Sequence, residues 1–348
     1  MKPIRAAMVT PLTGPLAMYG RVAGEAVRLW VDEVAEPESV ALTLYDTHPD
    51  PVSALRQAEA SRPDVLFGPY GRGPALAVAR ATSRLMWNGG GATARLAAPE
   101  FENVVNIPAP AASYFQGGLA AIRDADPQVA SMVAIHTGKG FSGEVAGGAV
   151  SAAREIGVTC AEALFQPGRA SESLARAPSA DVLALVGSFE DELEMVRAAN
   201  RRRWRAVLSV GAGVDEVLEA LGDGREGLLG PAQWMPRAAF RPDVGPDFEW
   251  FINSYQRRCG ALPPYPAVQA LAAAVIWWEC VRVAGTLEES ALLAQARRLD
   301  VRTLYGAFRL DPVSGLQVGH RVVTVQWQDG FRRVVWPPHR AEGSLRLL

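Results

Sequence analysis

The sequence has few of the residues from which disulfide frameworks and zinc sites are built. Its 348 residues include 3 cysteines and 4 histidines, and only two of its 35 basic residues, Lys2 and Lys139, are lysines. An odd number of cysteines without metal-ligand spacing argues against both kinds of site. We expect buried thiols, and one bridge between Cys259 and Cys280 remains an alternative.

Neither an excess of one charge nor a long hydrophobic run is present. The formal net charge of −2 predicts no nucleic-acid partner and no acidic tail. The most apolar segment, residues 267–281, carries Gln269 and Glu279 and predicts a buried helix instead of a membrane span. The first residues, MKPIRAAMVT, lack the apolar stretch and cleavage site of a signal peptide. Either the protein is cytoplasmic or a targeting segment was removed.

Catalytic motifs are also missing. The sequence has no Gly-x-Ser-x-Gly elbow, no His-Glu-x-x-His pair and no acidic cluster with metal spacing. The acidic run at residues 190–194 is typical of a first helical turn, where carboxylates favour the helix dipole. We therefore predict no enzyme, no metal site and no cofactor. The histidines are scattered at His48, His136, His320 and His339.

Apolar strands instead alternate with amphipathic helices along most of the chain, a pattern that predicts parallel, doubly wound sheets. The length favours two lobes. Strands are expected at 4–10, 40–45 and 64–67 and around Val133, Cys160, Leu183 and Val207, with helices at 22–34, 53–60, 73–85, 142–156, 171–177, 190–202 and 214–221. After Trp234 we expect helices at 245–258, 266–284 and 288–299 and antiparallel strands at 305–310, 318–327 and 331–336.

The segments that follow the strands are rich in glycine, proline, aromatic and hydroxyl residues. Ligands of open α/β sheets bind at the carboxyl ends of the strands, where glycines let the backbone approach and helix N-termini point N–H groups outward. Six such segments on two sheets predict a ligand cleft between two lobes. They are TPLTGPLAMYG, GPYGRGPA, WNGGGATA, HTGKGFSG, VGSFEDE and SVGAGVDE.

HTGKGFSG, residues 136–143, contains the Gly-x-Gly-x-x-G pattern of dinucleotide sites. A true fingerprint lies at the first strand of its sheet and has an acidic residue after the next strand, whereas Glu162 lies inside the expected strand. A phosphate-binding P-loop also fails, because Gly138-Lys139-Gly140 lacks the required order. We therefore interpret the segment as a loop that faces a ligand other than a nucleotide.

In order and spacing, these loops resemble the type I periplasmic solute-binding proteins of ABC transporters, the Leu/Ile/Val-binding-protein-like group. The resemblance rests on AAMVTPLTGPLAMYG, DVLFGPYGRG, LMWNGGGATARL, NVVNIPAPAASYFQGG and TLYGAFRLDP, and it runs from about residue 4 to 336. It implies an α/β fold with two doubly wound Rossmann-like lobes joined by three crossover segments, which close on a ligand by hinge motion. The lobes are expected at 1–112 plus 238–304 and at 113–237 plus 305–348.

The resemblance implies an extracytoplasmic, periplasmic binding subunit of an importer. Its expected partners are a small solute and a membrane permease, and it is expected to be a monomer. A cytoplasmic ligand-sensing regulator of the amide-sensor type is the alternative, because related folds serve that role. An enzyme on the same scaffold is a third and less favoured possibility.

The resemblance also assigns ligand-binding positions. Tyr19 matches an aromatic residue that covers the ligand, and two first-lobe loops match those that hold an amino acid carboxylate. The full set is Tyr19, Tyr70, Gly71, Arg72, Gly91, Ala92, Thr93, Ser113, Tyr114, Phe141, Phe189, Ala212 and Trp234.

Two of these positions depart from the family pattern. Arg72 lies where a small hydroxyl residue is usual, and Ala212 replaces an acid that binds an ammonium group. A guanidinium suits a carboxylate, and an unpaired buried ammonium is costly. We therefore predict a small organic acid, with an aromatic acid as one option. Several rings offer surfaces on which a flat ligand can stack, namely Tyr19, Tyr70, Phe141 and Phe189, with Trp234 and Tyr265 as further candidates. Amino acids, amides and urea remain alternatives.

Overall fold

The computed structural model describes residues 3–34, 39–214, 217–236 and 241–348. The chain divides into two compact units, unit 1 (Met1–Pro110 and Ala239–Arg321) and unit 2 (Ala111–Ala238 and Val322–Leu348). The chain therefore passes between them three times, and the second passage lies outside the described residues. We expected the third passage after residue 304. It comes after Arg321, because Tyr305 is held inside unit 1 by a 2.9 Å hydrogen bond from the Gln269 amide.

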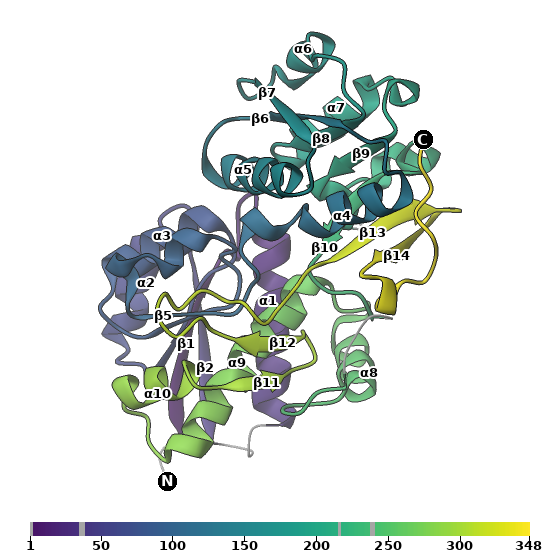
Figure 1. Cartoon of the computed structure of the whole chain (residues 1–348). Coiled ribbons are helices and arrows are strands. Elements are labelled where there is room, and N and C mark those ends of the chain that lie inside the picture. The colour runs from purple at the N-terminus through teal and green to yellow at the C-terminus, as the bar shows by residue number, and fades with distance from the viewer. Residues whose placement is uncertain (1–2, 35–38, 215–216, 237–240) are drawn as a thin grey trace. The chain divides into compact units, whose positions relative to one another are not determined.

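Unit 1 is built on a sheet of five parallel strands in the order β2-β1-β3-β4-β5. Figure 1 labels β1, β2 and β5 of this sheet. The strand bounds are β1 Ile4–Thr10, β2 Val40–Asp46, β3 Val65–Phe67, β4 Met86–Asn88 and β5 Val104–Asn106. Ala6 of β1 lies opposite Leu42 on one side and Val65 on the other. The helices are α1 Ala17–Glu33, α2 Pro51–Ala60, α3 Arg72–Ala81, α8 Phe248–Cys259, α9 Tyr265–Ala284 and α10 Glu289–Ala296.

Helix α9 is the apolar segment that predicted a buried helix. It is long and apolar enough to cross a membrane by length and composition, yet 67% of its most hydrophobic window is buried. It packs beside α1, as Figure 1 shows. Gly285 ends the helix in the left-handed conformation, with φ of 64°. The helix is therefore a core element of unit 1, as the sequence predicted.

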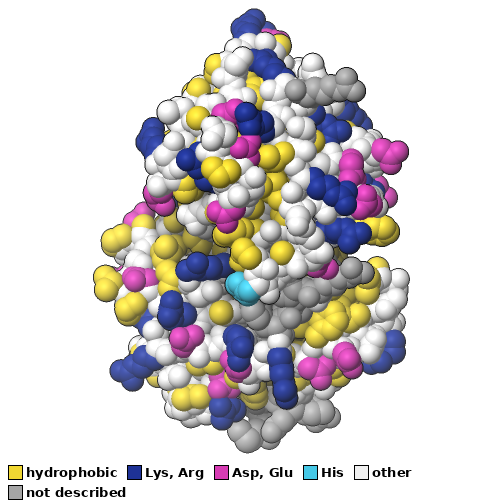
Figure 2. Space-filling view, turned by 45° about the vertical axis from the view of Figure 1, so that its right-hand side comes forward, with side chains coloured by type: hydrophobic (Ala, Val, Ile, Leu, Met, Phe, Trp, Pro, Cys, Tyr) yellow, Lys and Arg dark blue, Asp and Glu magenta, His cyan; other side chains and the backbone are white. Residues whose placement is uncertain are grey.

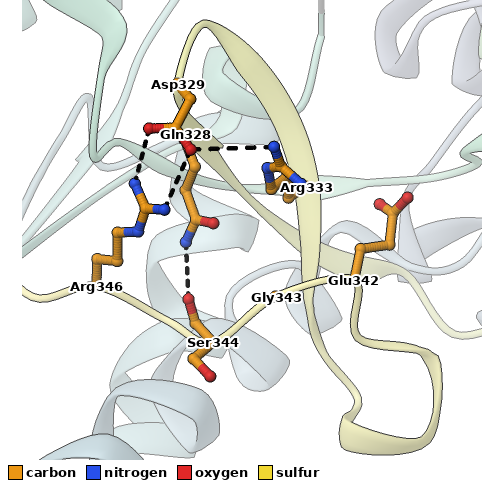
Figure 3. Close-up of a pocket in the computed structure, with 7 residues that line it drawn as sticks. All are labelled: Gln328, Asp329, Arg333, Glu342, Gly343, Ser344 and Arg346. Carbon is orange, nitrogen blue, oxygen red and sulfur yellow. Dashed lines mark hydrogen bonds and ion pairs between the residues drawn. The ribbon is translucent and has the colours of Figure 1, made fainter.

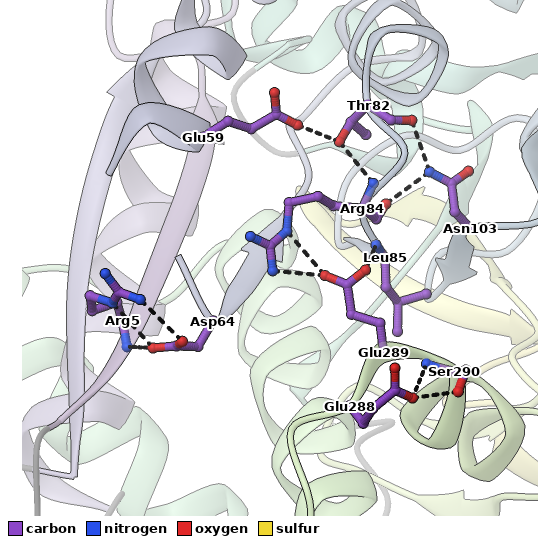
Figure 4. Close-up of polar contacts among 10 residues, drawn as sticks. All are labelled: Arg5, Glu59, Asp64, Thr82, Arg84, Leu85, Asn103, Glu288, Glu289 and Ser290. Atoms are coloured by element: carbon purple, nitrogen blue, oxygen red, sulfur yellow. Dashed lines mark hydrogen bonds and ion pairs between the residues drawn. The ribbon is translucent and has the colours of Figure 1, made fainter. Parts of the chain in front are cut away.

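Ion pairs join neighbouring elements where the unit 1 strands begin (Figure 4). Asp64, just before β3, accepts a 2.7 Å hydrogen bond from the backbone N–H of Arg5 in β1. Glu289 of α10 binds the Arg84 guanidinium at 2.7 Å and the Leu85 N–H at 3.0 Å. The opposite edge of the sheet is left for the glycine-rich loops.

Unit 2 contains a sheet of seven strands in the order β14-β13-β10-β9-β8-β6-β7. Strands β6 to β10 are parallel and repeat the order of unit 1, whereas β13 and β14 are antiparallel additions. The bounds are β6 Ser131–His136, β7 Thr159–Leu164, β8 Val182–Val186, β9 Ala206–Ser209, β10 Leu229–Ala232, β13 Val323–Gln328 and β14 Phe331–Trp336. The helices are α4 Gln116–Ala125, α5 Gly140–Glu155, α6 Ala170–Ala175 and α7 Phe189–Ala198.

Two sheets of mostly parallel strands, each accompanied by helices, confirm the predicted α/β fold class, and the differences are local. The helix expected at 214–221 is wrong, because the described part is a 3₁₀ segment, Glu219–Arg225, broken at Gly222 with φ of 50°. Residues 215–216 lie outside the described residues. The strand expected at 305–310 is β12, Ala307–Arg309, which pairs with β11, Asp300–Arg302, in a separate two-stranded sheet.

The cysteines form no disulfide, so the alternative of a Cys259–Cys280 bridge is wrong. Cys280 is the buried thiol that the sequence predicted, and burial raises its pKa to about 12. Cys259 is exposed near the end of α8, in contrast to the expectation of buried thiols.

Candidate functional site

The two unit 1 loops that the resemblance assigned to ligand binding are joined by their backbones. The N–H of Gly71, between β3 and α3, donates a 3.1 Å hydrogen bond to the carbonyl of Gly90, which follows β4. Gly71 has φ of 96°, and a Cβ added to Gly90 would lie 2.6 Å from Cα of Tyr70. Both positions therefore need glycine, and the two loops form one backbone cradle at the carboxyl ends of β3 and β4.

Three tyrosines lie beside this cradle. The rings of Tyr19 and Tyr70 stack with centroids 4.8 Å apart and planes at 19°. The hydroxyl of Tyr70 also forms a short hydrogen bond with the hydroxyl of Tyr265, at the start of α9. Three separate segments of unit 1 thus place aromatic rings together, two of which the sequence assigned to the ligand.

Buried amides support the second loop. Asn88, fully buried at the end of β4, accepts the N–H of Gly91 at 2.7 Å and donates to the carbonyl of Gly91 at 2.9 Å. Its amide also binds Asn106 of β5 at 3.0 Å. Thr93 is buried, and its hydroxyl accepts the N–H of Arg95. Ala92 is half-buried. The sequence analysis missed Asn88, although a buried asparagine directly after an apolar strand is a recognisable signal.

A carboxylate organises the loop that leads to Tyr19. Asp46, at the end of β2, accepts hydrogen bonds from the hydroxyl of Thr13 at 2.6 Å and from the backbone N–H of Leu12 at 2.8 Å and His48 at 3.0 Å. Partial burial raises its pKa, but these donors outweigh that effect and lower the pKa of Asp46 to about 2. The carboxylate is therefore ionised at neutral pH and holds this loop in place.

Arg72 is half-buried and is the first residue of α3, directly after Gly71. A guanidinium at the start of a helix adds its charge to the partial positive charge of the helix N-terminus. This end of unit 1 is therefore suited to a negatively charged group.

In unit 2 the structure brings Tyr114 and Phe141 together, with ring centroids 5.7 Å apart at 72°. Tyr114 is buried, and its hydroxyl forms a short hydrogen bond with the amide of Gln233. Burial raises the pKa of Tyr114, so the phenol is neutral. Ser113 is half-buried in the turn just before it, and Trp234 is buried beside Gln233 in sequence.

Phe189 and Ala212 lie on two loops that a buried carboxyl group joins. Phe189 is the half-buried first residue of α7. Glu192 of the same helix accepts hydrogen bonds from the hydroxyl of Ser209 at 2.5 Å and from the N–H of Gly211 at 2.7 Å. Ala212 is fully buried in the core of unit 2, and its carbonyl accepts from the Trp327 indole at 3.0 Å. The sequence analysis took Glu192 for a helix-dipole residue and missed this link.

The polar groups of HTGKGFSG bind neighbours within unit 2. The imidazole of His136 is 3.0 Å from the Glu162 carboxylate and accepts the N–H of Gly138 at 3.1 Å. The hydroxyl of Ser142 donates to the carbonyl of Val186 at 2.6 Å and accepts the N–H of Thr137. These bonds give His136 and Ser142 a structural role in the turn from β6 to α5.

Two pockets lie away from the predicted residues. One, of about 350 Å³, lies between the β13–β14 turn and the C-terminal segment, where Arg346 binds Asp329 with two hydrogen bonds of 3.1 Å (Figure 3). The other, of about 600 Å³, lies beside the end of α3 and residues 99–103.

In the part of the chain that the structure describes, no three metal-ligating side chains gather. Acidic and basic side chains are interspersed on the face in Figure 2, as the balanced charge implies.

Solved structures of similar fold include several binding proteins. The leucine-binding protein of Thermotoga maritima has a TM-score of 0.79 at 19% identity, covering 95% of this chain and 97% of that one. Two solute-binding proteins of ABC transporters from R. palustris, in complex with benzoate and 4-hydroxybenzoate, have TM-scores of 0.76 and 0.79 at 16% and 17% identity. Each match covers 99% of this chain and 97% of the other. At such identities the likeness shows the fold.

The family model described as periplasmic binding protein matches residues 3–332, nearly the whole chain. Proteins of this family are extracytoplasmic and bind small solutes for ABC permeases, without being enzymes. The match agrees with the two sheets of mostly parallel strands and with the repeated strand order of the two units. This chain therefore belongs to the periplasmic binding protein family.

Proposed function

We propose that the chain is the solute-binding subunit of an ABC importer and that its solute is a small organic acid with a flat, preferably aromatic body. In this proposal the two units close on the solute, and the closed form is presented to the permease. The observation that carries it is the unit 1 cradle. There, backbone groups of Gly71 and Gly90, the stacked rings of Tyr19 and Tyr70 and the Arg72 guanidinium belong to adjoining segments.

The charge of these groups favours an acid over an amino acid. Arg72 supplies a permanent positive charge beside the N-terminus of α3, and a carboxylate bound there forms charge-assisted hydrogen bonds. At the position where relatives are expected to carry an acid, Ala212 offers only a methyl group buried in the core. Glu192 lies near Gly211, but it is fully buried and already accepts three hydrogen bonds. An ammonium group would therefore lack its usual partner.

The aromatic part of the proposal rests on Tyr19 and Tyr70. An offset stack of two tyrosine rings offers a flat apolar surface, and a ring placed on it gains about 0.5–1.5 kcal/mol beyond the apolar area that it buries. Two neighbours of similar fold were solved with benzoate and 4-hydroxybenzoate, which supports this class of solute as the first to test.

Thermal-shift screening tests the proposal directly. Purified protein is heated with benzoates, aliphatic acids, branched-chain amino acids, amides and nucleotides, each present at high concentration. A ligand at 100 times its Kd adds about 2.7 kcal/mol to the free energy of unfolding, which is easily seen as a higher Tm. We expect aromatic acids to raise the Tm, and Arg72→Ala to abolish the shift. Arg80→Ala, an exposed position near the end of the same helix, is the matched control.

Other outcomes separate the alternatives. Stabilisation by Leu, Ile or Val would retain the transport role and refute the use of Arg72 and Ala212 made above. Stabilisation by NAD or ATP alone would return residues 136–143 to a nucleotide-binding role. Cell fractionation of the native protein distinguishes the importer from a cytoplasmic regulator of the amide-sensor type.

A further inference from the structure

The buried side-chain amide of Gln317 binds two segments of unit 1. One segment leads to the first passage between the units, and the other leads to the third. The Gln317 side chain is 2% exposed, and its Nε2 donates a 3.2 Å hydrogen bond to the carbonyl of Ile107, shortly before the first passage at Pro110. Its Oε1 accepts the N–H of His320 at 3.2 Å, directly before the third passage at Arg321. One side chain thus links two segments more than 200 residues apart in sequence.

The same oxygen also binds backbone groups of the turn that contains Gln317. Oε1 of Gln317 accepts the N–H of Arg309 at 3.2 Å and of Gly319 at 2.8 Å. A buried amide that uses its donor and its acceptor in this way is costly to replace, because each partner left unpaired loses its hydrogen bond. An asparagine is too short to span the same groups, and a leucine offers none of the bonds.

Neighbouring contacts anchor this segment to the body of unit 1. The ring of His320 stacks on Tyr305 with centroids 3.8 Å apart, and both side chains are buried. Tyr305 in turn accepts a 2.9 Å hydrogen bond from Gln269 of α9. The segment that ends at His320 is therefore continuous with the core of unit 1 and does not behave as a free linker.

We propose that Gln317 is a positioning residue of the hinge, which makes the unit 1 ends of the first and third passages move as one rigid piece. This inference rests on the proposed function, in which the units move relative to each other. With both ends fixed, the soft backbone dihedrals available for the movement are those after Ile107 and after His320. Without the amide, the link that remains between these segments is the longer bond of 3.4 Å from the Asn106 amide to the carbonyl of Gly315. The two passages then flex more independently, and the motion loses its single axis.

The test measures the movement without any ligand. Cys259 is exposed in unit 1, and Leu164, 62% exposed at the end of β7, offers a second label position in unit 2 as Leu164→Cys. Cys160→Ser removes the half-buried thiol, whereas Cys280 is fully buried and stays. Single-molecule energy transfer between the two dyes then reports the distribution of distances between the units.

Two variants distinguish the hydrogen bond to Ile107 from the hydrogen bonds to Arg309, Gly319 and His320. Gln317→Ala removes every bond of the amide, whereas Gln317→Glu at pH 8 keeps an acceptor for the His320 N–H and loses the donor to Ile107. Gln326→Ala is the matched control, because Gln326 is a buried amide that binds the C-terminal segment at the carbonyl of Arg346. We expect both Gln317 variants to widen the distance distribution and the control to leave it unchanged.

Hydrogen exchange supplies the second readout. The amide of His320 should exchange roughly tenfold faster in Gln317→Ala, which corresponds to about 1.4 kcal/mol of local protection lost with the hydrogen bond. In Gln317→Glu its rate should stay near that of the unmutated protein. An unchanged distance distribution in both variants would overturn the inference and leave Gln317 a purely structural residue. Because no solute is used, a protein that binds none of the acids above can still pass or fail this test.

Discussion

The pH dependence of stability can be predicted most directly for Glu192, because its carboxyl group is fully buried yet accepts several hydrogen bonds. Besides Ser209 and Gly211 it accepts the N–H of Gly187 at 3.3 Å. Burial raises its pKa, the hydrogen bonds lower it, and the nearby Asp191 carboxyl raises it again, with burial the largest effect and a resulting pKa of about 7. The folded protein therefore holds a proton at Glu192 at pH values where the unfolded chain has lost it.

The sign and size of the effect follow by linkage. Unfolded, Glu192 ionises near its reference pKa of 4.5, and folded near 7, so stability is fully present below pH 4.5 and falls as the pH rises to about 7. The difference between these two pKa values, at about 1.4 kcal/mol per unit, gives a loss of about 3 kcal/mol, most of which falls between pH 5 and pH 8.

Glu192→Gln removes this ionisation. The glutamine oxygen can accept from Ser209 and Gly211, and its amide nitrogen then faces Gly187, the weakest of the three donors. Urea unfolding at pH 5, 6, 7 and 8 should show the free energy of unfolding of the variant rising relative to that of the unmutated protein by about 2–3 kcal/mol across the range. Glu190→Gln, an exposed position on the same helix, should give a constant difference. Parallel curves for Glu192→Gln and the unmutated protein would refute the reasoning.

Two further predictions concern unit 1. Asp46→Asn should lower the free energy of unfolding by about 1 kcal/mol at pH 7, a value reduced for partial exposure of the carboxylate. In urea titrations this difference should vanish as the pH falls from about 4 toward 2, where the folded carboxylate protonates. Gly90→Ala should cost about 1–3 kcal/mol because its Cβ meets the Tyr70 backbone, and calorimetry should show a lower Tm. Gly73→Ala, with no atom within 4 Å of the new Cβ, should not lower it.

Much of the fold follows from patterns that act over short distances. Apolar runs such as Ile4–Thr10 and the alanine-rich Tyr265–Ala284 form the expected strand and helix, since burial of their side chains decides both. The helix expected at 214–221 is not observed in its described part. The 3₁₀ segment Glu219–Arg225 overlaps its end, buries none of its residues and contains Gly222 and Gly224, which oppose helical backbone. The third passage between the units was expected after residue 304 and comes after Arg321. Its position depends on the contact between Gln269 and Tyr305, which are far apart in sequence, so a local pattern does not predict it.

The candidate residues divide in a similar way. Tyr19 and Tyr70, which the sequence assigned through loop position, do lie together in unit 1, and so do Tyr114 and Phe141 in unit 2. The buried groups that hold those loops, Asn88 among them, were missed. The end position of Asn88 on an apolar strand is visible in the sequence, but its partners Gly91 and Asn106 are brought to it only when the strands are assembled. The role of the whole set in binding a solute stays a prediction.

The hydrogen bond between Gly71 and Gly90 holds the cradle together without using any side chain. It joins main-chain atoms, so the side chains at positions 70, 72 and 92 can change without removing it. Under the proposed function, evolution or a combinatorial library can retune the solute at those three positions while the scaffold keeps its shape. A receptor built in the proposed way would be a practical starting point for biosensors of new small acids.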